Sequence, residues 1–411
     1  MKEYPQMLSV LRIAALLAVL APLGAASARD YQTQDSCDGF PKVFLKTRPG
    51  LCVGLVASHL GFARGVATIG HDVFVVDMGG WRKGQGRLLR LQQDGHAPLE
   101  VLLSGLDKPS ALVAGSDGAL YMGVAGRIVR VDLSGAKPEM RDVVTGLPET
   151  GRHPLTALAF APDGQLYINI GSATDHCETP DDDAPDAQKA CSETAQSPPR
   201  ASIVSIRPGP GAVAWKDAKL VATGLRNSMG LAVLPNGTLV AAVNARDAIN
   251  KADPNLSDTA LPHDTYDVIR PGADYGWPYC FDNNLPSPEY PNHACADMEK
   301  PALLLPAHAA PLGLLAYQGD ALPDLQGQLV VPYHGYRKTG HRIMTLKISA
   351  GGEPVGVPEP LVWGWEGRTP LSPVGAPVSV AEMADGSLLV SEDHNGTLLR
   401  IAKSDVHGET H

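Results

Sequence analysis

The sequence predicts an all-β fold, a six-bladed β-propeller built from four-stranded antiparallel blades. Three observations predict it. A short apolar strand, a turn of the Asp-Gly or Asn-Gly type and a second apolar strand recur along the chain. A further strand follows most copies, and no convincing long amphipathic helix interrupts them. Three or four strands in each of about six repeats are typical of a propeller.

The copies of the hairpin can be followed in chain order. Clear copies cover residues 66–76, 111–122, 157–168, 231–242 and 380–391, and a looser sixth copy joins 313–317 to 326–332. We expect the glycine of each turn to supply the positive φ angle that two-residue hairpins need. The following strands are expected at 126–131, 201–206, 341–346 and 396–401. A parallel solenoid is the competing repeat fold, but its period should be shorter and more uniform.

Composition excludes several classes of protein. The chain has 411 residues, a formal net charge of −10 and 44% hydrophobic residues, enough for a sizeable core. Its 43 Gly and 35 Pro fall short of the content of a low-complexity chain. The acidic balance argues against nucleic acid as a partner, because such binding needs clustered Lys and Arg.

The first residues and the cysteines predict export. Basic residues precede the apolar run 13–20, and Ala26-Ser27-Ala28 fits signal-peptidase cleavage, so residues 1–28 are predicted to be a signal peptide. Residues 29–411 would then form a single propeller domain, with no membrane span and a periplasmic or secreted location. Six cysteines fall into three local pairs, and we favour neighbour pairing among the possible connectivities because each pair brackets a loop-like stretch.

Three segments in order carry a family resemblance. Residues 152–154 (RHP) precede the turn at 162–164 (PDG), residues 224–232 read GLRNSMGLA, and residues 273–280 read ADYGWPYC. Together they resemble the soluble sugar dehydrogenases that depend on pyrroloquinoline quinone (PQQ), and most closely the sorbosone-dehydrogenase-like members. The resemblance covers most of the chain, from about Gly61 to Ile401. It implies a six-bladed propeller that holds PQQ over a calcium ion.

The resemblance also implies roles for particular residues. His153 precedes the Pro-Asp-Gly turn as the family's catalytic histidine does, so it is the predicted general base that takes the substrate hydroxyl proton. Arg226 and Asn227 match the family's Arg-Asn pair, and Arg226 would stabilise developing oxyanion charge. Asn244 falls at a cofactor-contacting position. The backbone carbonyls of Ala245 and Arg246 fall where calcium is bound.

Two departures from the family pattern affect the cofactor and the substrate. The glucose-oxidising members carry two arginines that neutralise cofactor carboxylates, where this chain has Ala376 and Val378. Candidates for replacement contacts are His334, Arg337 and Lys338, which form a basic cluster with His341 and Arg342 after residues 330–332. An ordinary solvated turn accounts equally well for Arg337 and Lys338. His308 is a further predicted contact of the cofactor. Arg152 replaces an acidic neighbour of the base, which suggests a different sugar or reaction partner.

Three functional classes remain open at this point. The first is an exported quinoprotein that oxidises a sugar, or a related alcohol or aldehyde, and passes electrons to a separate acceptor, since no CxxCH haem motif occurs. The second is a catalytically degraded propeller that binds a ligand or a protein. A sugar-lactone hydrolase is a weaker third class, because it would need carboxylate metal ligands that converge on the channel.

Overall fold

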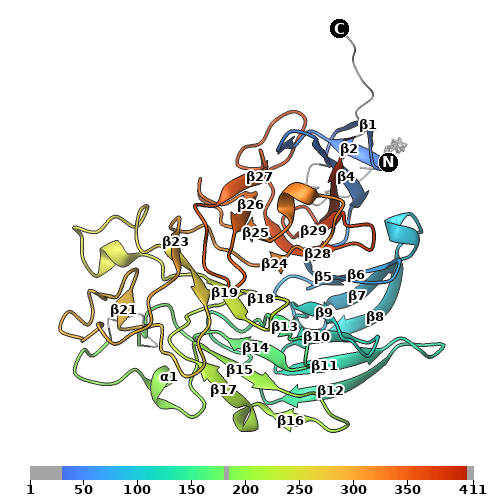
Figure 1. Ribbon diagram of the computed structural model, residues 1–411. Coiled ribbons are helices and arrows are strands. Elements are labelled where there is room, and N and C mark those ends of the chain that lie inside the picture. The colour runs from blue at the N-terminus through green and yellow to red at the C-terminus, as the bar shows by residue number, and fades with distance from the viewer. Residues whose placement is uncertain (1–29, 180–184, 405–411) are drawn as a thin grey trace, which may run out of the picture.

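The computed structural model describes residues 30–179 and 185–404. The predicted signal peptide, residues 1–28, lies outside the described residues. Six antiparallel sheets surround a common axis, which confirms the predicted six-bladed propeller (Figure 1). The innermost strands pack in a closed ring in the order β5, β9, β13, β18, β24, β28 and back to β5, with β25 mediating the contact between the fifth and sixth blades.

The first three blades follow one another along the chain. Blade 1 contains β5 (Ala63–Ile69), β6 (Asp72–Asp77), β7 (Gly86–Leu91) and β8 (Glu100–Leu106). Blade 2 contains β9 (Leu112–Ala114), β10 (Leu120–Val124), β11 (Arg127–Asp132), β12 (Glu139–Thr145) and β16 (Val213–Ala214). Blade 3 contains β13 (Leu158–Phe160), β14 (Leu166–Ile170), β15 (Ser202–Ile206) and β17 (Lys219–Ala222).

The other three blades include the strands from the N-terminal segment. Blade 4 contains β18 (Gly230–Val233), β19 (Leu239–Val243), β20 (Asp264–Val268) and β23 (Leu303–Leu305). Blade 5 contains β24 (Leu315–Ala316), β25 (Gln328–Tyr333), β26 (Arg342–Lys347), β27 (Glu359–Trp363) and β3 (Lys46–Thr47). Blade 6 contains β28 (Pro377–Glu382), β29 (Leu388–Glu392), β30 (Thr397–Lys403), β4 (Leu51–Ala57), β2 (Phe40–Val43) and β1 (Thr33–Cys37).

Loops between these strands carry the remaining short elements. They are the hairpin of β21 (Cys280–Phe281) and β22 (Leu285–Pro286), the helix α1 (Ser192–Ala195), and the 3-10 turns η1 (Gln93–Gly95), η2 (Trp215–Asp217), η3 (Ile249–Lys251) and η4 (Pro323–Leu325). Three blades are four-stranded as predicted, and the others gain strands from insertions or from the N-terminal segment.

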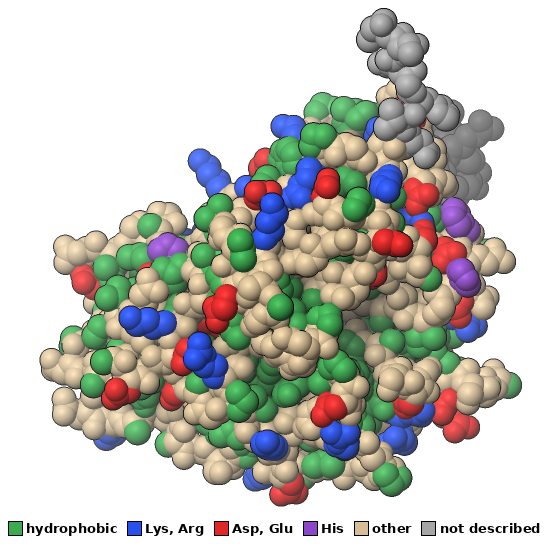
Figure 2. Space-filling view, in the orientation of Figure 1, with side chains coloured by type: hydrophobic (Ala, Val, Ile, Leu, Met, Phe, Trp, Pro, Cys, Tyr) green, Lys and Arg blue, Asp and Glu red, His purple; other side chains and the backbone are tan. Residues whose placement is uncertain are grey.

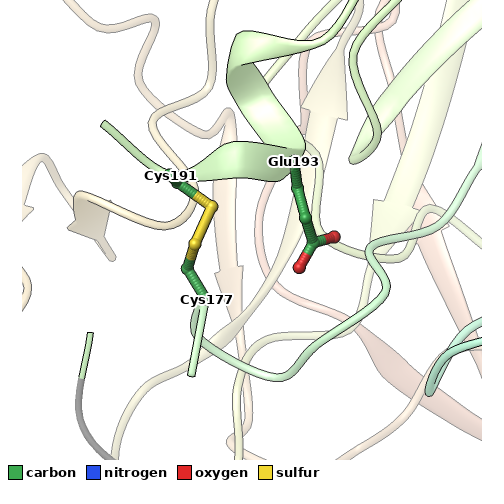
Figure 3. Close-up of side chains that lie close together, drawn as sticks. All are labelled: Cys177, Cys191 and Glu193. Atoms are coloured by element: carbon green, nitrogen blue, oxygen red, sulfur yellow. A yellow bond between two sulfur atoms is a disulfide. The ribbon is translucent and has the colours of Figure 1, made fainter. Parts of the chain in front are cut away.

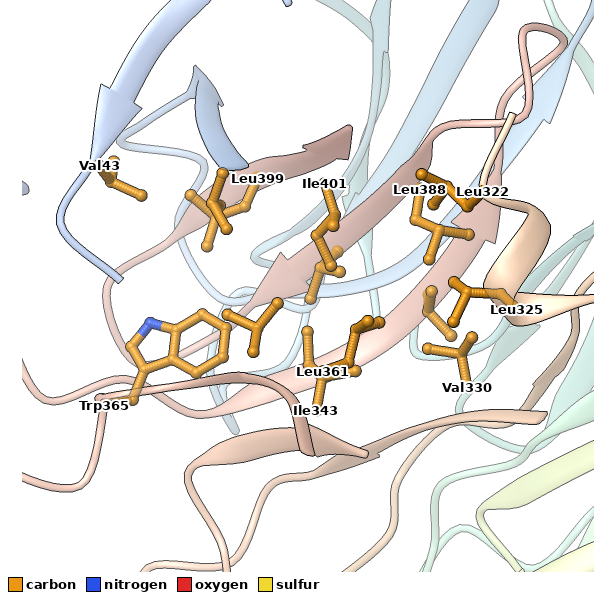
Figure 4. Packing of buried hydrophobic residues seen from close by; sticks show 14 of the residues in the cluster. Val43, Leu322, Leu325, Val330, Ile343, Leu361, Trp365, Leu388, Leu399 and Ile401 are labelled. Atoms are coloured by element: carbon orange, nitrogen blue, oxygen red, sulfur yellow. The ribbon is translucent and has the colours of Figure 1, made fainter. Parts of the chain in front are cut away.

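The ring is closed by pairing between the two ends of the chain. The N-terminal strand β4 pairs antiparallel with the C-terminal strand β30, and β3 pairs with β27 of blade 5. The interface of blades 5 and 6 with the N-terminal segment contains a large apolar cluster that includes Trp365, Leu388 and Leu399 (Figure 4). The buried Trp365 indole donates to the Tyr31 hydroxyl at 2.6 Å, which satisfies the one polar atom of that ring.

The repeated turns differ in one detail from the prediction. Gly118, Gly164, Gly237 and Gly386 all have positive φ, between 74° and 89°, but the Asp or Asn before each does not. In the turn at 161–165, Gly164 N–H donates to the Ala161 carbonyl and Asp163 Oδ1 accepts the Gln165 N–H. These are longer hairpin loops, in which a type I turn is followed by a left-handed glycine, and not two-residue turns.

The disulfides join neighbouring cysteines as predicted. They are Cys37–Cys52, Cys177–Cys191 and Cys280–Cys295. The face in Figure 2 mixes Lys and Arg with Asp and Glu and has no large patch of one sign. Within residues 30–179 and 185–404, no helix has the length and apolar character needed to cross a membrane.

Candidate active site

The site residues predicted from sequence gather at one end of the propeller. The two innermost strands of a blade are antiparallel. The start of the first strand and the finish of the second strand therefore lie at the same end of the propeller. Segments before the first strands carry His153, Arg226, Asn227 and His308, and segments after the second strands carry Asn244, Ala245, Arg246 and His334. A channel of about 260 Å³, lined by the innermost strands, lies along the axis.

His153 is held in a defined orientation through Nδ1. This atom lies 3.1 Å from the carbonyl oxygen of Ser172 and 2.9 Å from its Oγ. The Ser172 hydroxyl donates its own proton to the Thr174 carbonyl at 2.6 Å, so both Ser172 oxygens act as acceptors toward the imidazole. The proton of the neutral ring therefore lies on Nδ1, and Nε2 keeps a lone pair that can accept a proton.

The surroundings of His153 favour the neutral imidazole. Burial lowers the pKa of His153 to about 3, and the nearby charge of Arg226 acts in the same direction. The loop is tightly packed, since a Cβ on Gly171 would lie 2.5 Å from His153 Cβ and 2.6 Å from its carbonyl oxygen. Glycine is therefore required at position 171 for the strand end to approach the base.

Ser172 contributes a testable part of this geometry. Replacing Ser172 with alanine removes one of two acceptors for His153 Nδ1, and a neutral hydrogen bond contributes about 1 kcal/mol. We expect kcat to fall about fivefold and the Nδ1-protonated tautomer, measured by ¹⁵N NMR, to lose population. Ser205→Ala, at a buried serine of β15, should change neither. A wild-type tautomer population in Ser172→Ala would contradict this role.

Arg226 is buried, and each nitrogen of its guanidinium group donates one hydrogen bond to a backbone carbonyl or a carboxylate. Nε donates to the Asp175 carbonyl at 3.1 Å, Nη1 donates to the Asn244 carbonyl at 3.0 Å, and Nη2 pairs with the Asp175 carboxylate. That carboxylate also accepts the Asp247 N–H at 3.1 Å. Burial raises the pKa of Asp175, but hydrogen bonding from His176 and the charge of Arg226 outweigh it and leave the pKa below its ordinary value. The ion pair thus joins three loops beside His153.

Two buried amide oxygens at this end have no partner. Within the described residues, Oδ1 of Asn227 and Oδ1 of Asn244 accept no hydrogen bond. The two residues adjoin, because Asn244 N–H donates to the Asn227 carbonyl at 3.0 Å. A buried polar atom left unpaired costs about 1–3 kcal/mol, so its presence in a native site calls for an explanation such as a ligand. The two oxygens can accept hydrogen bonds from a bound group.

The loop after β19 presents free carbonyl groups. Ala245 N–H donates to Asp264 Oδ1 at 2.8 Å, and the Arg246 side chain forms a buried ion pair with Glu289. In the part of the chain that the structure describes, no hydrogen bond reaches the carbonyl oxygen of Ala245 or Arg246. Carbonyl oxygens of this kind are suitable ligands for a hard cation such as calcium.

The cations assigned to the cofactor from sequence are partly paired with carboxylates. His308 Nδ1 lies 3.1 Å from Asp247 Oδ1, and this hydrogen bond raises the pKa of His308 above its ordinary value. Arg337 donates to the Asp258 carboxylate at 2.7 Å, and Lys338 is exposed. The segment around Arg337 is therefore not a patch of free positive charge.

His334 belongs to a buried group of ionisable side chains that includes Arg64, a residue that the sequence analysis did not assign to the site. His334 Nε2 lies 3.0 Å from Asp393 Oδ1, and the other Asp393 oxygen lies 3.3 Å from Arg64 Nε. Burial outweighs the nearby carboxylate and lowers the pKa of His334. Arg64 lines the axial channel together with Val378. It therefore places a guanidinium group in the same channel as Val378, one of the two apolar positions that depart from the family pattern.

An exposed aromatic ring lies next to this group. The Tyr336 residue is 64% exposed, and its ring meets the His334 ring edge-on with centroids 5.0 Å apart. The rings of His341 and His394 lie 6.1 and 6.3 Å from it. An exposed aromatic ring next to His334 offers an apolar face on which a sugar ring can stack.

A disulfide holds the loop that carries Ser172 and Asp175. Cys177 and Cys191 form a disulfide beside Glu193 (Figure 3). The Glu193 carboxylate accepts hydrogen bonds from the N–H groups of Ala173 and Thr174. The three side chains lie close together, but the bonded sulfurs offer no thiolate to a metal. This arrangement positions the loop and forms no metal site of its own.

The fold is shared with solved structures of low sequence identity. The Trichoderma reesei protein of carbohydrate-active enzyme family AA12 has a TM-score of 0.70 at 18% identity, over 90% of this chain and 100% of that chain. The PQQ domain of Coprinopsis cinerea pyranose dehydrogenase has a TM-score of 0.69 at 18% identity, over 89% and 99%. The soluble aldose sugar dehydrogenase of Escherichia coli has a TM-score of 0.59 at 17% identity, over 86% and 100%. These likenesses establish the fold.

Sequence comparison identifies the family. An uncharacterized protein of Borreliella burgdorferi is 27% identical over 194 residues, 45% of this chain and 49% of the relative, so the match spans about half of that protein. The profile of the family described as Glucose / Sorbosone dehydrogenase matches residues 121–368, more than half of the chain. The matched region contains His153, Arg226, Asn244 and His334. The chain therefore belongs to the Glucose / Sorbosone dehydrogenase family.

Proposed function

We propose that the protein is an exported quinoprotein that oxidises a sugar, or a related alcohol or aldehyde, at this end of the propeller. The observation that carries the proposal is the position of His153 beside buried Arg226. Within the described part of the chain, His153 Nε2 and the Oδ1 atoms of Asn227 and Asn244 have no hydrogen-bond partner. Family membership supports the same chemistry. Three disulfides support an oxidising compartment such as the periplasm.

The residues present fit PQQ and calcium. Arg226 and Arg64, although each is paired with a carboxylate, would direct their remaining N–H groups to the carboxylates of an anionic cofactor. An Asn oxygen could accept the one pyrrole N–H of PQQ or a substrate hydroxyl. The free carbonyl groups of Ala245 and Arg246 would hold calcium. When bound, PQQ would supply the two-electron acceptor that protein side chains lack.

The protein's own contribution is to hold the substrate and remove a proton. His153 Nε2 would take the hydroxyl proton as the carbon–hydrogen bond breaks, its two electrons leave with the hydride and a carbonyl group forms. Arg226 would stabilise negative charge on the oxygen, and the rigid Asp175 pair would prevent the guanidinium from moving away. Tyr336 would contact the sugar ring. Electrons would then pass to a separate acceptor.

Reconstitution tests the proposal directly. Purified protein should be titrated with PQQ in the presence and absence of calcium, and then assayed by dye reduction with glucose, other aldoses and sorbosone. We expect saturable quinone binding that needs calcium, followed by sugar-dependent dye reduction. Quinone binding without turnover on any sugar would favour a ligand-binding propeller, and absence of quinone binding would refute the proposal.

Arg64 offers a test of the cofactor site that is independent of turnover. Arg64→Met should weaken PQQ binding by about tenfold to a hundredfold, because a charge-assisted hydrogen bond contributes about 1.5–3 kcal/mol. Affinity would be measured by fluorescence quenching in the presence of calcium. Arg207→Met, at an exposed arginine paired with Asp163, is the matched control. Wild-type affinity in a folded Arg64→Met protein would remove Arg64 from the site.

A further inference from the structure

Arg200 is a buried arginine next to the loop that carries His153. It lies between α1 and β15 and is 7% exposed. Its Nε donates to the Gly171 carbonyl at 2.8 Å, and its Nη1 donates to the Thr150 carbonyl at 3.2 Å. Across residues 30–179 and 185–404, its guanidinium group forms no ion pair with a carboxylate. Backbone carbonyl groups are therefore its direct partners.

These two carbonyl groups belong to the two segments that determine the orientation of His153. Thr150 lies three residues before His153 in the loop that carries the base. Gly171 directly precedes Ser172, whose two oxygens are the partners of His153 Nδ1. The guanidinium group of Arg200 therefore joins the segment that bears the base to the segment that orients it.

The burial of Arg200 is costly and calls for an explanation. Its Nη2 is buried and has no hydrogen-bond partner among the described residues. Burial lowers the pKa of Arg200, and the nearby charge of Glu193 opposes this effect only in part. A buried guanidinium group without a paired carboxylate lowers stability. Arg200 and His153 also line one small cavity of about 10 Å³, the size of a single water molecule, so the arginine packs close to the base.

We propose that Arg200 is a positioning residue for His153. Its planar fork of N–H groups holds the two segments at the separation at which His153 Nδ1 meets both oxygens of Ser172. The Nε2 atom of His153 then keeps its lone pair and a fixed direction toward the substrate. This inference rests on the proposed function, in which His153 is the general base. A lysine would keep the charge, but its single nitrogen cannot reproduce the fork.

The test combines a signal from the resting protein with kinetics. Arg200→Met keeps a long side chain but removes both donors. In protein without PQQ, ¹⁵N NMR should show that the Nδ1-protonated tautomer of His153 loses population. After reconstitution with PQQ and calcium, kcat should fall about tenfold to a hundredfold, because a small displacement of a catalytic group has an effect of this size. PQQ affinity should stay at the wild-type value, and Arg200→Lys should give intermediate values of the tautomer population and of kcat.

A matched control separates positioning from general stability. Arg400→Met replaces another buried arginine with an unpartnered nitrogen, in β30 of blade 6, and should change neither the His153 signals nor kcat. Should Arg200→Met not fold, Arg200→Lys decides. A wild-type tautomer population in a folded Arg200 variant would overturn the proposal, as would equal losses in the Arg400 variant. Absence of turnover in the wild type would instead refute the proposed function, because the NMR signal of the resting protein does not depend on turnover.

Discussion

Replacing His153 with alanine is expected to lower kcat by about a hundredfold to ten-thousandfold, with little change in PQQ affinity. His153 provides the Nε2 atom that accepts the substrate proton, whereas the proposed cofactor contacts come from Arg64, Arg226, Asn227 and Asn244. Steady-state dye reduction and quinone titration on the same preparation measure the two effects. His59→Ala, at an exposed histidine, should leave both unchanged.

The protonation state of His153 gives a second readout of the same assignment. Because burial lowers the pKa to about 3, the imidazole should stay neutral as the pH falls from 8 to 5, whereas an ordinary histidine would become protonated. NMR titration of the His153 ring carbons would follow this directly. A midpoint near 6.5 would show that the base is solvent-exposed, and a wild-type kcat in His153→Ala would assign proton removal to another group.

The repeated hairpins were predictable because each is a local feature. The strands at 111–122, 157–168 and 231–242 form where short apolar runs flank an Asp-Gly or Asn-Gly turn. The side chain before each glycine accepts a hydrogen bond from the N–H group two residues later. The pairing of β4 with β30 was not predictable in this way. It joins segments more than 300 residues apart, and neither carries a local signal that names its partner.

The residues of the candidate site also differ in how far the sequence predicts them. His153, Arg226 and Asn244 flank repeat strands, so their place in the repeat already puts them at one end of the propeller. Asp175 and Arg64 were missed because their roles depend on contacts across blades. Asp175 lies in a disulfide-held loop and meets Arg226 only after blades 3 and 4 pack together. The sequence signal for Arg64 is a charged residue two positions before the apolar repeat segment 66–76.

Asp175→Leu is expected to destabilise the protein by about 3–5 kcal/mol, because it leaves Arg226 buried without its counter-charge. Urea unfolding measures the change, and Asp186→Ala, at an exposed acid, should leave the unfolding curve unchanged. The double variant Asp175→Leu/Arg226→Met should recover much of the lost stability, since apolar residues of similar size can replace a buried ion pair.

Activity should not follow stability in that double variant. If Arg226 stabilises charge on the substrate oxygen and Asp175 acts by holding it, the double variant should fold and yet remain far less active than the wild type. Recovery of both properties would mean that the ion pair only supports the loops around His153. If stability recovers and activity does not, the Arg226 guanidinium is needed for function itself, because the double variant replaces the packing contacts that the ion pair supplied.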